Sequence, residues 1–288
     1  LYFYMVHYLL MDKEAANLQY GATQAWVYAF TFIGGLFADK IFGFRKSLFW
    51  GGLLMIVGSL ILAIDPKSFF FVGVSFSIVG TGFFKPNISS MVGKLYKDGD
   101  SRTDAGFSLF YAGVNLGALI GGYVCIAIGK GQMLSSLIPD ELKWNVAFGL
   151  AAVVMVISLL TFTQTQKSLG EIGLSPLLHL DKSKRKLYEW STYVGSILIV
   201  PIIILMVSNT VYTDYFMYAI GPISILYLAY EMKGFSIIEN KKLVAAVIFM
   251  LFSIVFWAFF EQSGGSLSDF AAENLHSTVL GLPLDPNG

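Results

Sequence analysis

Long apolar stretches separated by short polar loops run through most of the chain. Stretches that could cross a bilayer lie at 1–11 (incomplete), 22–42, 47–64, 68–93, 105–128, 144–164 and 242–263, with two further apolar runs at 192–210 and 214–231. Spanning the hydrocarbon takes about 20 predominantly apolar residues in a helix. None of these runs shows sustained alternation of polar and apolar positions, so strands are not expected. The pattern predicts an all-α membrane protein.

Composition supports a membrane environment for most side chains. Hydrophobic residues make up 56% of the 288 positions and charged residues only 13%, whereas a soluble domain has about 25% charged residues. The net charge of +0 gives no reason to expect a nucleic-acid partner. Cys125 is the single cysteine, so a disulfide within the chain is excluded. No cleavable signal peptide precedes the first apolar run.

The distribution of basic residues predicts the orientation. Cytoplasmic loops carry an excess of Lys and Arg. If the loop at 39–46 is inside, the basic residues placed outside are Lys13, Lys67, Lys130 and Lys143. This asymmetry favours six crossings, a cytoplasmic loop at 165–190, a two-helix hairpin that starts and ends inside, and a seventh crossing. The basic group at 182–186 then keeps this loop on the cytoplasmic side. The alternative is that it binds an anionic lipid headgroup.

The first of three polar motifs is GLFADKIFGFRK at 35–46. Glycine allows close helix contact, Asp39 follows the apolar run, and Arg45 and Lys46 lie on the basic side. An ordinary basic loop is the plain alternative. The combination resembles the cytoplasmic loop signature of the major facilitator superfamily, which implies that Asp39, Arg45 and Lys46 form a conformational latch.

The second motif, GTGFFKPNIS at 80–89, places Lys85 inside an apolar stretch. An intramembrane Lys costs about 2.5–3.5 kcal/mol on insertion scales, so it is expected to face a cavity or a counter-charge. Pro86 removes a backbone donor and is expected to loosen the helix. Snorkelling to the interface is the alternative. Because Lys94 lies more than two turns further on, Lys85 is deep for snorkelling, and a functional role is favoured.

The third motif, FWAFFEQSGGS at 256–266, ends a long apolar run with Glu261. Trp257 and Glu261 are four residues apart and are predicted to share a helix face. A carboxyl group in a low-dielectric cavity can bind a proton near neutral pH. The alternative is an acidic residue at the outer helix end, with Trp257 as an interfacial anchor.

Together with FYAGVNLG at 110–117, these motifs resemble the proton-dependent oligopeptide transporter family of the major facilitator superfamily. The resemblance extends from Leu1 to about residue 272. It implies a substrate site formed by Phe3, Tyr4, Tyr28, Lys85, Asn115, Trp257 and Glu261. It also implies that His7, Lys85 and Glu261 serve proton coupling or gating, with protons as the coupling ion and no cofactor or metal.

Four positions depart from the family pattern. Met5 replaces a common Gly, and His7 replaces an Arg that pairs with the acid at the position of Glu261, so that pair could itself titrate near neutral pH. Gly21 stands where animal members have a His, which excludes coupling of that type here. Asp269 falls where an apolar residue is usual, and the sequence assigns it no role.

The resemblance implies a defined domain order. Residues 1–164 would form the N-terminal six-helix bundle with a truncated first span, 165–190 a cytoplasmic loop and 191–235 a two-helix insert. Residues 236–272 would contain the first span of the C-terminal bundle and 273–288 an external tail, the rest of that bundle being absent. The expected localisation is a bacterial cytoplasmic membrane, with the chain crossing it several times.

The expected function is proton-coupled import of di- and tripeptides by alternating access. A facilitator-type transporter for a non-peptide solute such as nitrate or a drug is the alternative. A membrane enzyme is not expected, because His7, His179 and His276 are far apart in sequence and no nucleophile elbow is present. A purely structural protein would not explain Lys85 and Glu261 at membrane depth.

Overall fold

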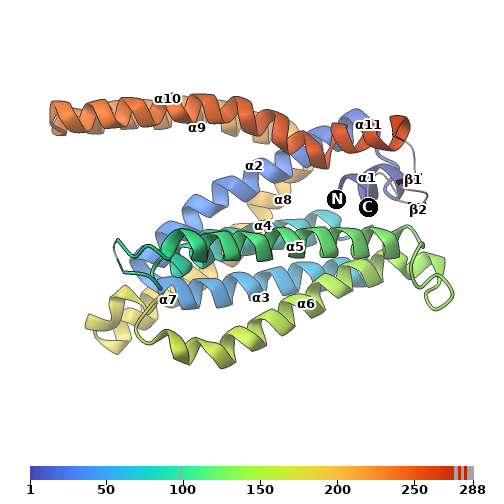
Figure 1. Cartoon of the computed structure of the whole chain (residues 1–288), viewed down its shortest axis with the longest axis horizontal. Helices are drawn as coiled ribbons and strands as arrows, with labels where there is room; N and C mark the ends of the chain where they lie inside the picture. Colours follow the sequence, from blue (N-terminus) through green and yellow to red (C-terminus); the bar gives the residue numbers. More distant parts are fainter. Residues whose placement is uncertain (98, 276–277, 280–281, 284–288) are drawn as a thin grey trace. The chain divides into compact units, whose positions relative to one another are not determined.

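The computed structural model describes residues 1–97, 99–275, 278–279 and 282–283 (Figure 1). The chain divides into two units, one formed by Leu1–Ala22 with Asn209–Asn287 and the other by Thr23–Ser208. The boundary falls inside a continuous helix, α2 (Lys13–Phe37). The two units are described separately below.

Helices form nearly all of the described structure. Their bounds are α1 (Tyr2–His7), α2 (Lys13–Phe37), the π-helical turn η1 (Ala38–Phe42), α3 (Gly43–Ile64), α4 (Phe70–Gly93), α5 (Thr103–Gly129), η2 (Asp140–Leu142), α6 (Lys143–Thr165), η3 (Gln166–Leu169), η4 (Pro176–His179), α7 (Lys182–Leu198), α8 (Val200–Ser208), α9 (Thr210–Glu231), η5 (Met232–Gly234), α10 (Ile237–Phe260), η6 (Glu261–Gly264) and α11 (Ser266–Asn274). A two-residue antiparallel pair, β1 (Thr278–Val279) and β2 (Leu282–Pro283), follows.

Five helical stretches of the described chain are long and apolar enough to cross a membrane. They are Lys13–Ile64, Thr103–Gly129, Asp140–Leu169, Lys182–Ser208 and Ile237–Gly264. The first contains both α2 and α3, joined by η1. Helices α4 and α9 have 24 and 22 residues but are not among these stretches. The prediction of an all-helical protein with several membrane helices is confirmed, whereas the exact number of crossings stays a prediction.

Helices α3, α4, α5 and α6 lie side by side in the second unit (Figure 1). Leu48 of α3, Met91 of α4 and Leu159 of α6 form a buried apolar cluster. Phe44 and Phe162 pack against its edge. This cluster joins three helices that are far apart in sequence.

Glycines bring α4 against both α2 and α3. A Cβ added to Gly34 of α2 would lie 2.4 Å from the carbonyl carbon of Gly82, and one added to Gly51 of α3 would lie 2.5 Å from the carbonyl oxygen of Gly80. Such contacts leave no room for any side chain. Small residues of this kind let membrane helices approach at backbone distance and maximise van der Waals contact. The glycines of the 80–89 motif therefore position α4 between its neighbours.

Two helices begin earlier than hydropathy predicted. Helix α2 begins at Lys13 rather than near residue 22, and α7 begins at Lys182, inside the range assigned to the loop at 165–190. The added turns are rich in Lys, Arg, Glu, Gln and Ala, which have good helix propensity. Hydropathy marks only the apolar part of a helix, so it missed these polar turns.

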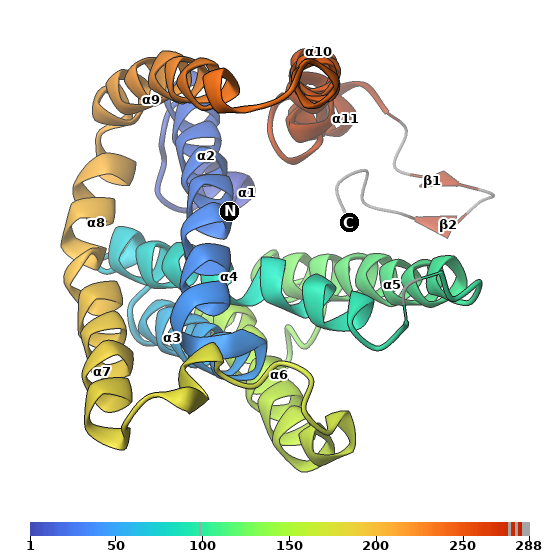
Figure 2. The ribbon, with the colours of Figure 1, turned by 90° about the vertical axis from the view of Figure 1, so that its left-hand side faces the viewer.

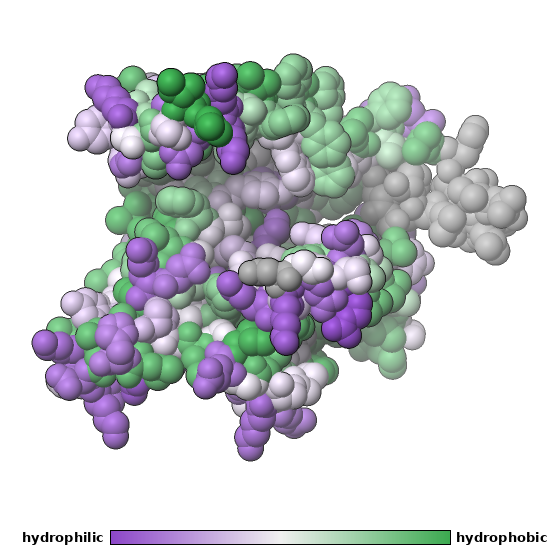
Figure 3. All heavy atoms as spheres, turned by 60° about the vertical axis from the view of Figure 1, so that its left-hand side comes forward, coloured by the Kyte–Doolittle hydropathy of each residue, from purple (hydrophilic) through white to green (hydrophobic). Residues whose placement is uncertain are grey.

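The chain between α6 and α7 folds back onto the α2–α3 junction. Gly43 has φ +72°, and the backbone of residues 173–174 passes so close to it that a Cβ would not fit. The Ser175 hydroxyl donates to the Ile41 carbonyl over 2.5 Å. Beyond this loop, α7 and α8 follow one another closely (Figure 2). Figure 3 shows hydrophilic side chains gathered in clusters among apolar ones.

The first unit contains α1, α9, α10 and α11. Helix α10 begins with a capping box, in which the Ser236 hydroxyl and the Glu239 carboxylate bond reciprocally to backbone N–H groups. No residue of α10 is buried, although the helix is strongly apolar. The external tail expected at 273–288 lies partly outside the described residues.

Candidate functional site

Lys85 and Tyr28, two of the predicted substrate-binding residues, are in direct contact. The Lys85 Nζ atom lies 4.7 Å from the centre of the Tyr28 ring. The close approach of α2 and α4 at Gly34 and Gly82 sets this geometry. An ammonium over an aromatic face is stabilised by the ring quadrupole. Both side chains remain accessible, with Tyr28 39% exposed, so the ammonium can still meet an anionic ligand.

The helix beneath Lys85 is continuous despite Pro86. Helix α4 extends through this position to Gly93. The buried Asn87 side chain donates to the Phe83 carbonyl over 2.7 Å and to the Gly34 carbonyl over 3.5 Å. Asn87 thus links α4 to α2 one turn from the Lys85–Tyr28 pair. The expected loosening at Pro86 does not interrupt the helix.

Asn115 lies on α5 in a long exposed segment of the helix. A Cβ added at Gly113 or Gly117 would meet no atom within 4 Å. Residues 111–123 of α5, Asn115 among them, are all exposed in the described structure. The hydrogen-bonding role expected for Asn115 stays a prediction.

The predicted residues of the first helix lie in the first unit. The Phe3 and His7 rings stack with centres 5.8 Å apart and planes 6° apart. Tyr4 is fully buried and stacks on Tyr8 at 5.2 Å. The stacking with Phe3 fixes the orientation of the His7 imidazole.

Trp257 and Glu261 lie at the end of α10. The helix ends at Phe260, and Glu261 begins the 3-10 turn η6 while its N–H bonds to the Trp257 carbonyl. The Trp257 ring makes edge contacts with Phe256 and Phe260 at 5.6 and 5.2 Å. This bond from residue 261 to residue 257 keeps the i,i+4 helical spacing between the two residues at the end of α10. The proton-linked role of Glu261 stays a prediction.

Two of the three expected latch residues have partners from later segments, Arg45 in the loop that follows α6 and Lys46 in α7. Arg45 donates from Nε to the Ile172 carbonyl over 2.7 Å and from Nη2 to the Gly170 carbonyl over 2.5 Å. Lys46 pairs with Glu189 of α7 at 2.6 Å. Asp39 is exposed and lines a small cavity of about 260 Å³ together with Lys94 and Glu171. The sequence did not identify Glu189 or the loop carbonyls, because these partners are more than a hundred residues away.

Asp269, which had no assigned role, has a partner in the structure. Its carboxylate lies 2.8 Å from the Lys13 Nζ, and Glu273 lies 2.5 Å from the same atom. These ion pairs connect the start of α2 to α11. A separation of more than 250 residues leaves no local pattern from which to predict them.

Two polar loops outside the membrane helices have acids with lowered pKa values. The Asp65 carboxylate accepts N–H bonds from Ser68 and Lys67, which lowers its pKa. Hydrogen bonds from Arg102 lower the pKa of Asp100 in the α4–α5 loop. In the part of the chain that the structure describes, no group of three or more His, Cys, Asp or Glu could hold a metal ion.

The apolar helices and the glycine-mediated packing define a helical membrane protein with several spans. A family profile described as the POT family (PTR2) matches residues 45–287. The chain therefore belongs to the POT family of proton-dependent oligopeptide transporters, within the major facilitator superfamily. The resemblance inferred from the motifs is confirmed, and membership of this family agrees with the expectation that the chain is not an enzyme.

Relatives with similar sequences are found in bacteria. The chain is 32% identical over 282 residues to the uncharacterized transporter YclF of Bacillus subtilis (strain 168), covering 95% of this chain and 54% of that protein. It is 32% identical over 301 residues to a di-/tripeptide transporter of Lactococcus lactis subsp. lactis (strain IL1403), covering 96% and 59%. The chain thus spans a little over half of the length of these relatives.

Solved structures show the same fold. The crystal structure of a peptide transporter POT in complex with sulfate matches with a TM-score of 0.75 and 32% identity, covering 100% of this chain and 59% of that one. A crystal structure of tetrameric PepTSo2 matches with a TM-score of 0.83 and 26% identity, covering 99% and 61%. The chain therefore has the major facilitator fold over the part that it spans.

Proposed function

We propose that the protein acts in proton-coupled import of di- and tripeptides by alternating access. The observation that carries the proposal is the accessible Lys85 ammonium of α4, held over the Tyr28 ring of α2. An intramembrane Lys is costly unless it serves a cavity or a ligand. The di-/tripeptide transporter among the relatives agrees with a peptide ligand.

Some of the proposed peptide contacts are those of the second unit. In the second unit, Lys85 would attract the peptide carboxylate, while Tyr28 and Asn115 would contact the peptide backbone. Aromatic walls accept side chains of many shapes, which suits broad selectivity. An inward proton also gains about 2.3 kcal/mol per 100 mV of membrane potential.

The first unit would supply the proton-linked residues. Glu261 would bind and release the coupling proton, and His7 would replace the Arg common at its position. Phe3, Tyr4 and Trp257 would form aromatic walls.

The same proposal includes the topology. Residues 1–164 would form the N-terminal six-helix bundle, 191–235 the two-helix insert and 236–272 the first span of the second bundle, in a bacterial cytoplasmic membrane. The Arg45 and Lys46 contacts would lie on the cytoplasmic side, and Asp39 would join the latch in another state of the cycle. The Lys13–Asp269 pair would then lie outside.

Uptake by the full-length protein in proteoliposomes tests this function. We would impose an inward proton gradient and follow labelled dialanine, with unlabelled di- and tripeptides as competitors. Accumulation should collapse with a protonophore and be lost in Lys85→Ala, because the peptide carboxylate loses its cation. Lys97→Ala, in the exposed loop after α4, is the matched control and should accumulate dialanine like the wild type.

Different substrates separate this proposal from its alternative. If a folded protein takes up no dialanine but accumulates nitrate or a drug, the peptide assignment is wrong and the facilitator alternative holds. Equal uptake by Lys85→Ala and the wild type would remove Lys85 from the site.

A further inference from the structure

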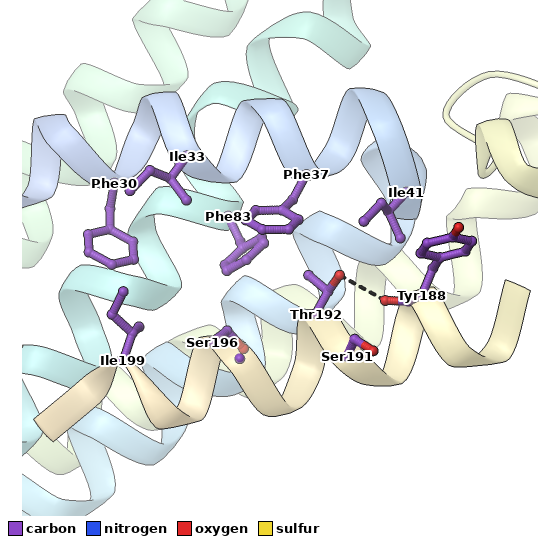
Figure 4. A pocket seen from close by; sticks show the side chains of 11 residues that line it. Phe30, Ile33, Phe37, Ile41, Phe83, Tyr188, Ser191, Thr192, Ser196 and Ile199 are labelled. Atoms are coloured by element: carbon purple, nitrogen blue, oxygen red, sulfur yellow. Dashed lines mark hydrogen bonds between the residues drawn. The ribbon is translucent and has the colours of Figure 1, made fainter. Parts of the chain in front are cut away.

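An apolar cavity of about 290 Å³ lies between α2 and α7, apart from the Lys85–Tyr28 contact (Figure 4). Its walls are Phe30, Ile33, Phe37, Ile41, Phe83, Tyr188, Ser191, Thr192, Gly195, Ser196 and Ile199. All of these residues belong to the second unit. Ligand pockets have volumes from about 300 Å³ upwards, so the cavity suits part of a hydrocarbon chain rather than a large molecule.

The Ser and Thr hydroxyls on the cavity wall are already bonded to their own helix. The Ser191 hydroxyl donates to the Leu187 carbonyl, Thr192 to Tyr188 and Ser196 to Tyr193, at 2.7–2.9 Å. Each hydroxyl hydrogen is thus used inside α7. The cavity therefore offers an apolar environment and few donors to a polar ligand such as a peptide.

Contacts on one flank hold α7 at a fixed place beside the cavity. The Tyr193 ring stacks on Phe42 with centres 4.6 Å apart and packs against Trp50 at the same distance. The Trp50 Nε1 atom donates to the Ser196 hydroxyl over 3.0 Å. Since α7 is held from this side, the space between it and α2 is a built feature of the unit.

Basic residues lie near one end of the cavity. Ile41 and Tyr188 mark this end, and Phe30 and Ile199 mark the other (Figure 4). On α7, Lys184 lies four residues before Tyr188 and therefore on the same face. On the α2 side, Lys40 directly precedes the lining residue Ile41 in the π-helical turn η1.

The segments 39–46 and 181–189 near this end contain seven Lys or Arg residues and three acids, Asp39, Asp181 and Glu189, so the charge balance is positive. Arg185 lies three residues before Tyr188, and Glu189 is engaged by Lys46 at 2.6 Å and lies 3.9 Å from Arg185. Lys40 and Lys184 are exposed. The apolar cavity suits an acyl chain, and the basic residues at its end suit an anionic headgroup. A phospholipid has both parts.

We propose that this cavity binds one acyl chain of an anionic phospholipid, whose headgroup phosphate is bound by Lys40, Lys184 and Arg185. The site is separate from the proposed peptide site and goes beyond the transport function. Its occupant would link the two-helix insert to the lipid composition of the surrounding leaflet.

Native mass spectrometry of the detergent-purified full-length protein tests the site. The probes are phosphatidylglycerol and phosphatidylcholine with the same acyl chains, titrated separately. The wild type should bind phosphatidylglycerol more tightly. Lys184→Gln should weaken phosphatidylglycerol about fivefold, since one basic residue near an anionic surface contributes about that factor, and should leave phosphatidylcholine unchanged.

A second substitution tests the cavity itself. A Cβ at Gly195 meets no atom within 4 Å, so Gly195→Phe fills the cavity without a backbone clash. It should weaken both lipids about tenfold, because several methylene groups lose their apolar surroundings. Ser191→Phe fills the same space should the first variant fail to fold.

Matched controls use positions away from the cavity. The first control is Lys186→Gln, because Lys186 lies on the face of α7 opposite Lys184. The second is Gly221→Phe on α9, where a Cβ also meets open space. Both should bind the two lipids like the wild type. Equal affinity for the two lipids, unchanged binding by the folded cavity-filling variants, or a dimer mass without lipid would each overturn the proposal.

Discussion

Helix α4 carries Lys85 and α10 ends just before Glu261, the two charged residues proposed to act in transport, yet the two helices are packed in opposite ways. Glycine contacts hold α4 at backbone distance from α2 and α3, and many of its residues are buried. Helix α10 belongs to one of the most apolar stretches of the chain, but none of its residues is buried. In a membrane, hydropathy reports solubility in lipid, whereas small residues determine which helices pack closely.

The comparison also separates two kinds of charged site. Lys85 lies within α4 beside an aromatic ring from a neighbouring helix, so the packing of its unit fixes its environment. Glu261 lies where α10 ends, and the contacts that fix its neighbours are those of α10 and η6. A substitution at Lys85 should therefore affect contacts between neighbouring helices, whereas one at Glu261 should affect contacts within α10 and η6.

The largest effect is expected for Glu261→Gln. The full-length variant should exchange labelled dialanine across the proteoliposome membrane but should not accumulate it against a gradient, because an amide cannot carry the proton. Glu273→Gln, an exposed acid of α11, is the control. If Glu261→Gln accumulates dialanine like the wild type, Glu261 has no coupling role.

The next effect concerns the packing of α4. Gly34→Ala places a Cβ against the Gly82 backbone and should destabilise the protein by about 1–3 kcal/mol, the usual cost of overpacking. The measurement is the Tm of the detergent-purified protein. Gly21→Ala, on the same helix but in open space, should leave the Tm near the wild-type value. Equal Tm shifts in the two variants would show that the glycine contacts do not hold α4.

A smaller and local effect is expected at the loop held by Arg45. Arg45→Gln loses the guanidinium bonds to the carbonyls of residues 170 and 172, of which one is exposed and the other partly buried. Amide hydrogen exchange at 170–174 should accelerate. Arg102→Gln, whose partner is Asp100 in another loop, should not change exchange at 170–174. Unchanged amide protection in Arg45→Gln would show that Arg45 does not hold this loop.

The smallest effect is expected at Asp65, in the turn between α3 and α4. The Asp65 carboxylate accepts N–H bonds and its folded pKa is lowered, so its stabilisation is complete above the ordinary Asp pKa of about 3.9. It is lost as the pH falls through the lower folded value. Asp65→Ala should lower the Tm slightly at neutral pH, and the difference from wild type should shrink in acid. A difference that grows in acid would contradict this assignment.

Much of the fold was predictable from local pattern. The apolar stretches gave the membrane helices, and the motifs around Asp39, Lys85, Asn115 and Glu261 indicated the family that the comparisons confirm. The polar starts of α2 and α7 were missed, because hydropathy does not register helical turns made of good helix-forming polar residues.

The candidate site was predictable in part. The Lys85–Tyr28 contact joins two residues that the resemblance had placed in one site. The partners of Arg45, Lys46 and Asp269 were not predictable. They are carbonyls or charges brought in from distant segments, and no spacing in the sequence reveals them.

The sequence by itself determined that this is a helical membrane protein of the POT family, because hydropathy and short motifs are local properties. Only the tertiary structure decided which glycines meet, which loop Arg45 holds and where α7 leaves an apolar cavity beside α2. These features depend on distances between segments that are remote along the chain, and helix packing sets those distances.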